Sequence, residues 1–95
     1  MKPDTQIHQK VTLYIIRGLA TGKNYVGITG NLTRRLNEHR HAASKGGQII
    51  GEFELIHTEE FEDYASARKR EIFMKSGKGR TWIKNNIVTR PAQGG

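Results

Sequence analysis

Residues 11–17 read Val-Thr-Leu-Tyr-Ile-Ile-Arg, and residues 24–29 read Asn-Tyr-Val-Gly-Ile-Thr. In the first run, β-branched and aromatic residues make both alternating faces apolar, which predicts a central strand covered on both sides. The segment between the two runs contains Gly18 and Gly22 and supplies the turn of a hairpin. The second run is therefore predicted to return as an antiparallel neighbour of the first.

A helix is predicted to follow this hairpin, because Asn31 is a favourable N-cap residue. Side chains that can pack on a sheet then recur at helical spacing, at Leu32, Leu36, His39 and Ala43. Arg35 and His39 are four positions apart, so they share one edge of this stripe. Lys45 and the two glycines after it are predicted to end the helix.

A third strand and a second helix are predicted in the next part of the chain. Residues 53–58 alternate, with Phe53, Leu55 and His57 on one face. Asp63 then caps a predicted helix over residues 64–75. One stripe of that helix consists of Tyr64, Ala67, Glu71 and Met74. A carboxylate in the middle of a packing face is unusual and calls for an explanation.

The remaining segments complete one domain. Residues 76–79 read Ser-Gly-Lys-Gly and are predicted to break the second helix, with one or two further turns over residues 80–85. Residues 1–10 and 88–95 are predicted to be a flexible arm and a flexible tail around a domain spanning 11–87. The predicted class is α/β of the α+β type, a small three-stranded antiparallel sheet flanked by helices.

The charge of the chain favours a polyanionic partner. Its 95 residues include 16 Lys and Arg against 9 Asp and Glu, which gives a net charge of +7. Such a balance favours nucleic acid ahead of an anionic membrane surface. The absence of cysteine excludes disulfides and thiolate metal sites. Without an apolar run long enough to cross a bilayer or a signal peptide, the protein is expected to be soluble and cytoplasmic, with no membrane partner.

Five residues form an ordered set that could carry chemistry. The four histidines match no metal-binding motif, and residues 27–30 match neither a Walker loop nor a dinucleotide fingerprint. What remains is Tyr14 and Tyr25 on adjacent strands, followed by Arg35, His39 and Glu71 on the two helices. Each residue alone has an ordinary interpretation, as a packing aromatic or a solvated charge. Their combination and order favour a catalytic site.

This set resembles the site of the GIY-YIG nuclease family. Residues 12–14 read Thr-Leu-Tyr and residues 25–27 read Tyr-Val-Gly, similar to the paired GIY and YIG elements, with 11 residues from tyrosine to tyrosine. Arg35 follows Tyr25 by 10 residues, as the arginine does in the family's first helix. Residues 67–71 read Ala-Arg-Lys-Arg-Glu and resemble the helix that bears the metal-binding glutamate. The resemblance covers residues 11–86 and implies the GIY-YIG fold.

The resemblance also implies a DNA endonuclease that depends on Mg²⁺ or Mn²⁺. Glu71 would be the protein ligand of one ion, and Arg35 would hold the phosphate oxygens. A phenol titrates near pH ~10 in water, so a tyrosine base needs cations beside it. Tyr14 is expected to be the general base and Tyr25 to orient water or phosphate, while the reverse assignment stays open. His39 would share a proton or contact phosphate.

Other expectations concern the substrate and its contacts. The cations expected to contribute to DNA binding are Arg34, Arg35, Arg40, Lys45, Lys69 and Arg70. The family's late asparagine corresponds to Asn85 or Asn86, and the sequence does not choose between them. No sequence-reading module is recognised, so three alternatives stay open: the domain acts on a DNA structure, acts weakly, or takes its specificity from a protein partner, with DNA repair as the expected setting. RNA stays open as a substrate, as does the oligomeric state, and the alternative function is a non-catalytic nucleic-acid-binding module of the same fold.

Overall fold

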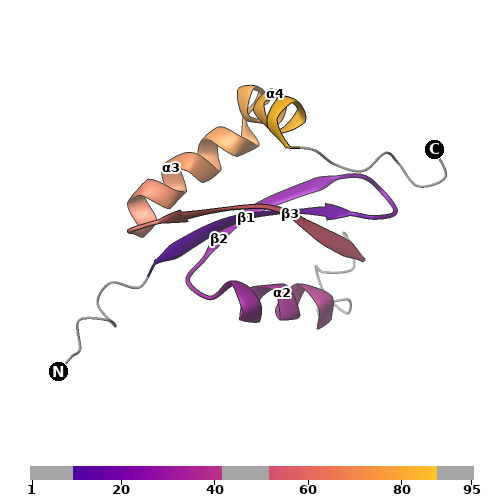
Figure 1. The fold of residues 1–95 in the computed structure, drawn as a ribbon, viewed down its shortest axis with the longest axis horizontal. Helices are drawn as coiled ribbons and strands as arrows, with labels where there is room; N and C mark the ends of the chain where they lie inside the picture. The colour runs from indigo at the N-terminus through magenta and orange to yellow at the C-terminus, as the bar shows by residue number, and fades with distance from the viewer. Residues whose placement is uncertain (1–9, 42–51, 88–95) are drawn as a thin grey trace.

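The computed structural model describes residues 10–41 and 52–87. The elements are β1 (Val11–Gly18), β2 (Asn24–Thr29), α2 (Leu32–His41), β3 (Phe53–Phe61), α3 (Tyr64–Lys75) and α4 (Gly77–Asn86). The strands form one antiparallel sheet in the order β2-β1-β3, with α2 on one face and α3 and α4 on the other (Figure 1). The predicted fold class is confirmed. The predicted arm, the predicted tail and the predicted end of the first helix lie outside the described residues.

The central position of β1 explains why both of its faces are apolar. Leu13 and Ile15 are completely buried on the face that packs against Met74 of α3 and Ile83 of α4. Truncation of either β1 side chain to alanine would cost about 2–5 kcal/mol, a large share of the net stability of a domain this size. No described helix is long and apolar enough to cross a membrane.

The opposite face of the sheet is covered by α2. Tyr14 and Ile16 of β1 are buried there. The partly buried side chains that pack against them are Tyr25, Leu32, Leu36 and Phe53. Because α2 rests on the same face as the two tyrosines, the helix brings its polar side chains close to the phenol groups.

A β-bulge in β3 overturns one expected alternation. Ile15 pairs with His57, but Ile16 pairs with Leu55, so Ile56 is the extra residue on β3. The bulge turns His57 to the α3–α4 face, where its ring lies edge-on to Trp82 at a centroid distance of 5.6 Å. The prediction that His57 shares a face with residues 53 and 55 is therefore wrong. The strand also continues to residue 61, beyond the predicted end at residue 58.

The predicted helix caps match the structure more closely than the predicted packing stripes within the helices do. Asn31 Oδ1 accepts from the Arg34 backbone N–H at 3.0 Å, and Asp63 Oδ1 accepts from the Ser66 backbone N–H at 2.8 Å. The boundaries of α3 match the predicted residues 64–75. Tyr64, however, is 57% exposed at the start of α3, so its predicted place on the packing stripe is wrong.

The break after α3 is shorter than predicted. Ser76 alone separates the helices, because its backbone N–H donates to Phe73 O while its Oγ accepts from the Gly79 backbone N–H at 3.1 Å. Gly77 and Gly79 lie inside α4 rather than in a loop. A Cβ on Gly79 would collide with the α3 backbone at Phe73 O and Met74. The glycine therefore permits the close approach of the two helices.

Candidate active site

Gly27 explains how Tyr14, a residue of the central strand, reaches the edge of the sheet. Tyr14 and Gly27 are directly paired across β1 and β2. A Cβ built on Gly27 would lie 2.5 Å from the Tyr14 hydroxyl oxygen and 2.7 Å from its Cζ. The Tyr14 ring therefore occupies the space above β2 that any other residue at position 27 would fill. The requirement for glycine here is steric.

Two side chains of α2 contact the Tyr14 hydroxyl. Arg35 Nε donates to this oxygen at 3.3 Å, and His39 Nε2 lies 3.1 Å from it. Arg35 Nη1 also donates to Glu38 Oε1 at 3.1 Å, which fixes the guanidinium from its other side. The predicted proximity of Arg35 and His39 is present, and both meet on Tyr14.

The chemistry of these donors assigns the protons. Arginine can only donate, so the Tyr14 oxygen accepts from Arg35, and its own hydrogen goes to His39 Nε2 when the His39 ring is protonated at Nδ1 alone. Partial burial, and then the charge on Arg35, lower the pKa of His39 below its ordinary value of 6.5, which favours a neutral ring that can accept this hydrogen. The hydrogen bond with Tyr14, followed by that with Glu38, raises the pKa of Arg35, which stays a cation.

Glu71 is the buried carboxylate of α3. Its residue is 7% exposed, and it lies between Ala67 and Met74 on the packing stripe, as the sequence predicted. Arg68 Nη1 donates to Glu71 Oε1 at 3.2 Å, and Lys75 Nζ donates to Oε2 at 3.0 Å. Both cations come from the solvent-exposed side of the helix, with side chains 64% and 56% exposed. They compensate a charge that would otherwise be costly to bury.

A single pocket at β2 is lined both by the Tyr14, Arg35 and His39 group and by Glu71. It has a volume of about 360 Å³. Its lining residues are Tyr14, Tyr25, Val26, Gly27, Ile28, Arg35, His39, Arg68, Glu71 and Lys75. Because β2 is an edge strand, the α2 face and the α3 face can open into one space at this side of the sheet. All five predicted catalytic residues line this pocket.

The other predicted site residues lie elsewhere. Arg34, Arg40 and Lys69 are exposed and do not line the pocket. Arg70 is held by Glu59 of β3, at the opposite edge of the sheet. Lys45 lies outside the described residues. Asn85 and Asn86 are exposed on α4 and do not line the pocket, and Asn86 Nδ2 donates to the Trp82 carbonyl at 2.9 Å.

Sequence reasoning missed the roles of Arg68 and Lys75. They stand three residues before and four residues after Glu71, which are the two spacings that place helix side chains on one face. Applying that rule to Glu71 would have found both. Arg70, which was predicted to contribute to DNA binding, immediately precedes Glu71 and binds Glu59 instead.

The donor set decides which metal ion the pocket could hold. No cluster of three or more His, Cys, Asp or Glu side chains occurs in residues 10–41 and 52–87. A single carboxylate with phenol oxygens nearby fits Mg²⁺ or Mn²⁺, which bind oxygen ligands and retain water and substrate contacts. It does not fit a structural zinc site, which requires four nitrogen or sulfur ligands.

Comparison with known proteins connects this geometry to one family. A family model described as the GIY-YIG catalytic domain matches residues 10–85, which include every residue of the pocket. No curated protein and no solved structure gives a significant match to the chain.

Proposed function

This chain belongs to the GIY-YIG catalytic domain family, whose members are nucleases that generally depend on a divalent metal ion, and on that premise we propose that it is a DNA endonuclease. The observation that carries the proposal is the convergence of Tyr14, Tyr25, Arg35, His39 and Glu71 on one pocket. These residues come from two strands and two helices. Packing of the core alone does not require five such polar groups to meet.

Glu71 would hold Mg²⁺ or Mn²⁺ at the wall of the pocket. When bound, the ion would supply positive charge to the phosphate oxygens and to the departing oxygen. Arg68 and Lys75 now contact the two carboxylate oxygens through exposed side chains. Such long side chains are free to turn toward a substrate phosphate once another cation neutralises Glu71.

Arg35 would hold the phosphate that is cut. Its bonds to Tyr14 and Glu38 use one N–H on Nε and one on Nη1. The guanidinium carries five N–H groups, so three remain for the non-bridging oxygens of a phosphodiester. Stabilisation of charge by such a fixed donor is commonly worth 10²–10³-fold in rate, on the order of 3–4 kcal/mol.

Tyr14 would act as the general base through His39. Water attacks phosphorus, and its proton moves to the Tyr14 oxygen as the Tyr14 hydrogen moves to His39 Nε2, 3.1 Å away. The new P–O bond forms while the bond to the 3′ oxygen breaks, and that oxygen takes a proton from solvent. The Arg35 N–H directed at the Tyr14 oxygen holds this hydroxyl in position for the transfer.

Tyr25 would orient the water or the phosphate. It lines the pocket on β2 and is partly exposed, but no hydrogen bond to its hydroxyl occurs among the described residues. The Tyr14 hydroxyl, in contrast, accepts a hydrogen bond from Arg35 and lies within hydrogen-bond distance of His39 Nε2, which can take its proton. This difference supports Tyr14 rather than Tyr25 as the base. We further propose a cytoplasmic enzyme with a role in DNA repair, whose specificity comes from a protein partner.

A cleavage assay tests the proposal. The purified protein is incubated with flap, forked, single-stranded and duplex DNA in Mg²⁺, Mn²⁺ or EDTA, with matched RNA as a further substrate. Metal-dependent cleavage of DNA is expected, and Glu71→Ala should abolish it while DNA binding is retained or slightly strengthened, because a carboxylate repels phosphate. Binding without cleavage in any metal would instead support a non-catalytic nucleic-acid-binding module.

A further inference from the structure

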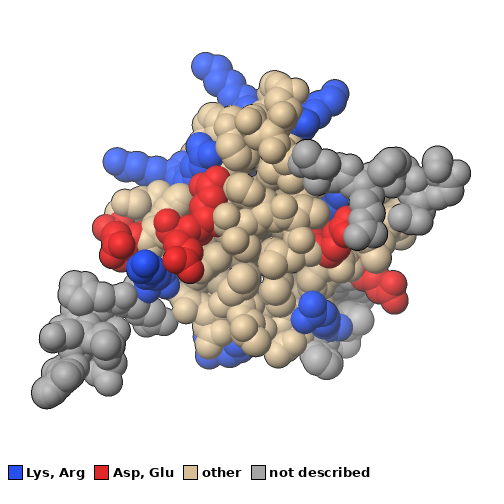
Figure 2. All heavy atoms as spheres, in the orientation of Figure 1, with Lys and Arg blue, Asp and Glu red and all other residues tan. Residues whose placement is uncertain are grey.

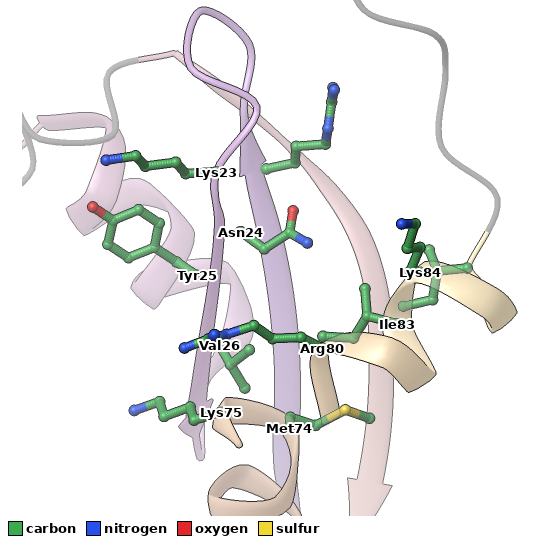
Figure 3. A pocket seen from close by; sticks show the side chains of 11 residues that line it. Lys23, Asn24, Tyr25, Val26, Met74, Lys75, Arg80, Ile83 and Lys84 are labelled. Carbon is green, nitrogen blue, oxygen red and sulfur yellow. The ribbon is translucent and has the colours of Figure 1, made fainter. Parts of the chain in front are cut away.

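A second and larger pocket lies beside the candidate active site. It has a volume of about 830 Å³ and runs between the first half of β2 and the helices α3 and α4 (Figure 3). Tyr25, Val26 and Lys75 line both pockets, so the two are continuous along the edge strand. We call this second pocket the basic groove, and its lining residues are Arg17, Lys23, Asn24, Tyr25, Val26, Met74, Lys75, Arg80, Ile83, Lys84 and Ile87.

Every charged residue that lines the basic groove is a lysine or an arginine. Arg17 is paired with Glu54 at 3.9 Å, and Lys75 is paired with Glu71. Within the described part of the chain, Lys23, Arg80 and Lys84 form no ion pair with a carboxylate. In Figure 3, Arg80 extends from α4 toward β2, across the space between the two elements. The groove therefore holds cationic charge that the protein does not neutralise.

The wall between these cations is apolar. Val26 and Ile87, which are partly exposed, line the groove over the buried Met74 and Ile83, while the Tyr25 ring packs on the α2 face of the sheet. A surface that only attracted duplex phosphates would need no such apolar wall, because the faces of paired bases are hidden in the stack. A single strand offers both its phosphates and the faces of its bases, and single-strand grooves combine cations with aromatic or apolar platforms.

We propose that the basic groove binds an unpaired nucleic-acid strand that continues from the phosphate in the active site. This inference rests on the proposed function, because the active site fixes where the strand begins. Phosphates contact Lys23, Arg80 and Lys84, and the bases lie over the apolar wall formed by Val26 and Ile87. The preferred substrate is then one with unpaired nucleotides on one side of the cut.

Binding measurements test the groove without cleavage. Fluorescence anisotropy of a labelled single-stranded oligonucleotide in EDTA is recorded over a range of salt concentrations. Each phosphate contact contributes about 0.7 to the slope of log K against log salt for single strands, so Arg80→Ala/Lys84→Ala should lower the slope by about 1.4. The control Lys10→Ala/Lys78→Ala also removes two positive charges, at residues outside both pockets. Its slope of log K against log salt should stay close to that of the wild type.

Two outcomes of these measurements would overturn the inference. One is an equal loss of slope in the groove variant and in the control variant, which would mean that only net charge matters. The other is an equal loss for blunt duplex and for single strand, which would mean that the groove does not select unpaired nucleotides.

Cleavage of shortened substrates separates this inference from the proposed function. Removing the unpaired nucleotides on one side of the cut should lower the wild-type kcat/KM by about tenfold, and the Arg80→Ala/Lys84→Ala rate should depend little on that side. If the protein cuts but ignores both flanks, the groove inference fails while the nuclease stands. If no substrate is cut in any metal but the salt slope still depends on Arg80 and Lys84, the proposed function fails and the groove remains a single-strand site.

Discussion

The two edges of the sheet use the same kinds of side chain in different ways. At the β2 edge, Glu71 is accompanied by arginine, histidine and tyrosine side chains that line an open pocket. On the β3 side, Glu59 is accompanied by Arg70, His57 and Trp82. Residue type alone therefore does not distinguish a reactive site from a structural cluster in this fold.

The β3 cluster satisfies its own charges. Arg70 binds both oxygens of Glu59, at 3.0 and 3.2 Å, while His57 Nε2 lies 2.8 Å from Oε2. The Arg70 guanidinium also lies over the ring of Trp82, 4.8 Å from its centroid. Burial alone would raise the pKa of Glu59, but the hydrogen bonds from Arg70 and His57 outweigh it and leave this pKa below its usual value. No group in the cluster needs a ligand.

The β2 edge has cations in excess instead. Residues 52–63, from just before β3 to the N-cap of α3, contain six of the nine acidic residues of the chain. Figure 2 shows acidic side chains gathered toward the two ends of β3, with basic side chains extending from α3 and α4. Glu71 is the one carboxylate among the described residues that line either pocket at the β2 edge. Segregation of the acids to one edge leaves the other edge free to attract a polyanion.

The largest predicted effect comes from neutralising Glu71 and Glu59 separately. Glu71→Gln keeps the side-chain shape but removes the charge that would hold the metal, so cleavage should fall on the order of 10³-fold or more. Its melting temperature should change little, because its partners Arg68 and Lys75 are exposed and screened by solvent. Single-turnover cleavage and thermal melting measure the two effects.

Glu59→Gln is the matched control for that prediction. It should leave the cleavage rate within about twofold and lower stability by ~1 kcal/mol, or 4–8 °C in Tm for a domain of this size. A loss of activity in Glu59→Gln equal to that in Glu71→Gln would mean that the two edges do not have separate roles.

The next effect separates catalysis from packing at Tyr14. Tyr14→Phe keeps the ring that packs on Gly27 and removes the hydroxyl that contacts Arg35 and His39. The chemical step should slow by roughly 10²–10⁴-fold. Stability should fall by no more than about 0.5–1.5 kcal/mol. Rapid-quench kinetics and melting curves provide the measurement.

Tyr25→Phe is the companion variant for the roles of the two tyrosines. It should show a smaller loss of rate than Tyr14→Phe, because its hydroxyl only orients the water or the phosphate. If Tyr14→Phe cuts at the native rate and Tyr25→Phe is inactive, the two roles are exchanged. If both cut normally, the tyrosines are packing residues.

Parts of this comparison were accessible from the sequence alone. The two apolar faces of residues 11–17 predicted a central strand, and the caps Asn31 and Asp63 predicted where two helices begin. The five residues predicted for the site all line one pocket. The strand and cap predictions rest on local periodicity and cap chemistry, which depend on residues close together in the sequence, whereas the site prediction rests on the order of the five residues and on the family resemblance.

The failures depend on contacts between distant residues. The bulge at Ile56 inserts one residue without disturbing the apolar content of β3. Gly79 lies inside a helix because α3 packs so closely against it that a Cβ at this position would collide with the α3 backbone. Arg70 was predicted to contribute to DNA binding, but the packing of α3 on the sheet brings its guanidinium to Glu59 of β3. Tertiary packing, rather than local preference, decided each case.

Substitution of Gly27, which lies in the sequence motif of β2 but is required by its packing against Tyr14, should have an intermediate effect on the cleavage rate. Gly27→Ala would place a Cβ 2.5 Å from the Tyr14 hydroxyl oxygen, so the ring must shift. A displacement of about 1 Å at a catalytic group can cost on the order of 10²-fold in rate. Gly22→Ala is the control, because Gly22 has φ +74° in the hairpin turn and its Cβ would meet only Arg17 Nη2 at 3.6 Å. That control should lose stability, by roughly 1–2 kcal/mol, at unchanged kcat. Equal kcat in both variants would show that Tyr14 needs no fixed position.

The smallest predicted effect is a separation of the two edges by pH. At the β2 edge, a neutral His39 must accept the Tyr14 hydrogen, and its pKa is lowered below 6.5. Activity should therefore fall only below pH 6.5, by about tenfold for each pH unit beneath the His39 pKa. At the β3 side, the folded-state pKa of Glu59 is lowered from 4.5, so its contribution to stability is present above pH 4.5 and lost as pH falls through the lower folded value. Protonation of His39, whose pKa is lowered, also disfavours the folded state. This effect begins below pH 6.5 and is small, since the ring is partly exposed.

The protein should thus lose activity on acidification while circular dichroism still reports a folded chain. His39→Gln should remove the acidic limb of the pH–rate curve, because an amide does not titrate. An acidic limb that persists in His39→Gln, or one that coincides with unfolding, would mean that His39 is not the proton acceptor.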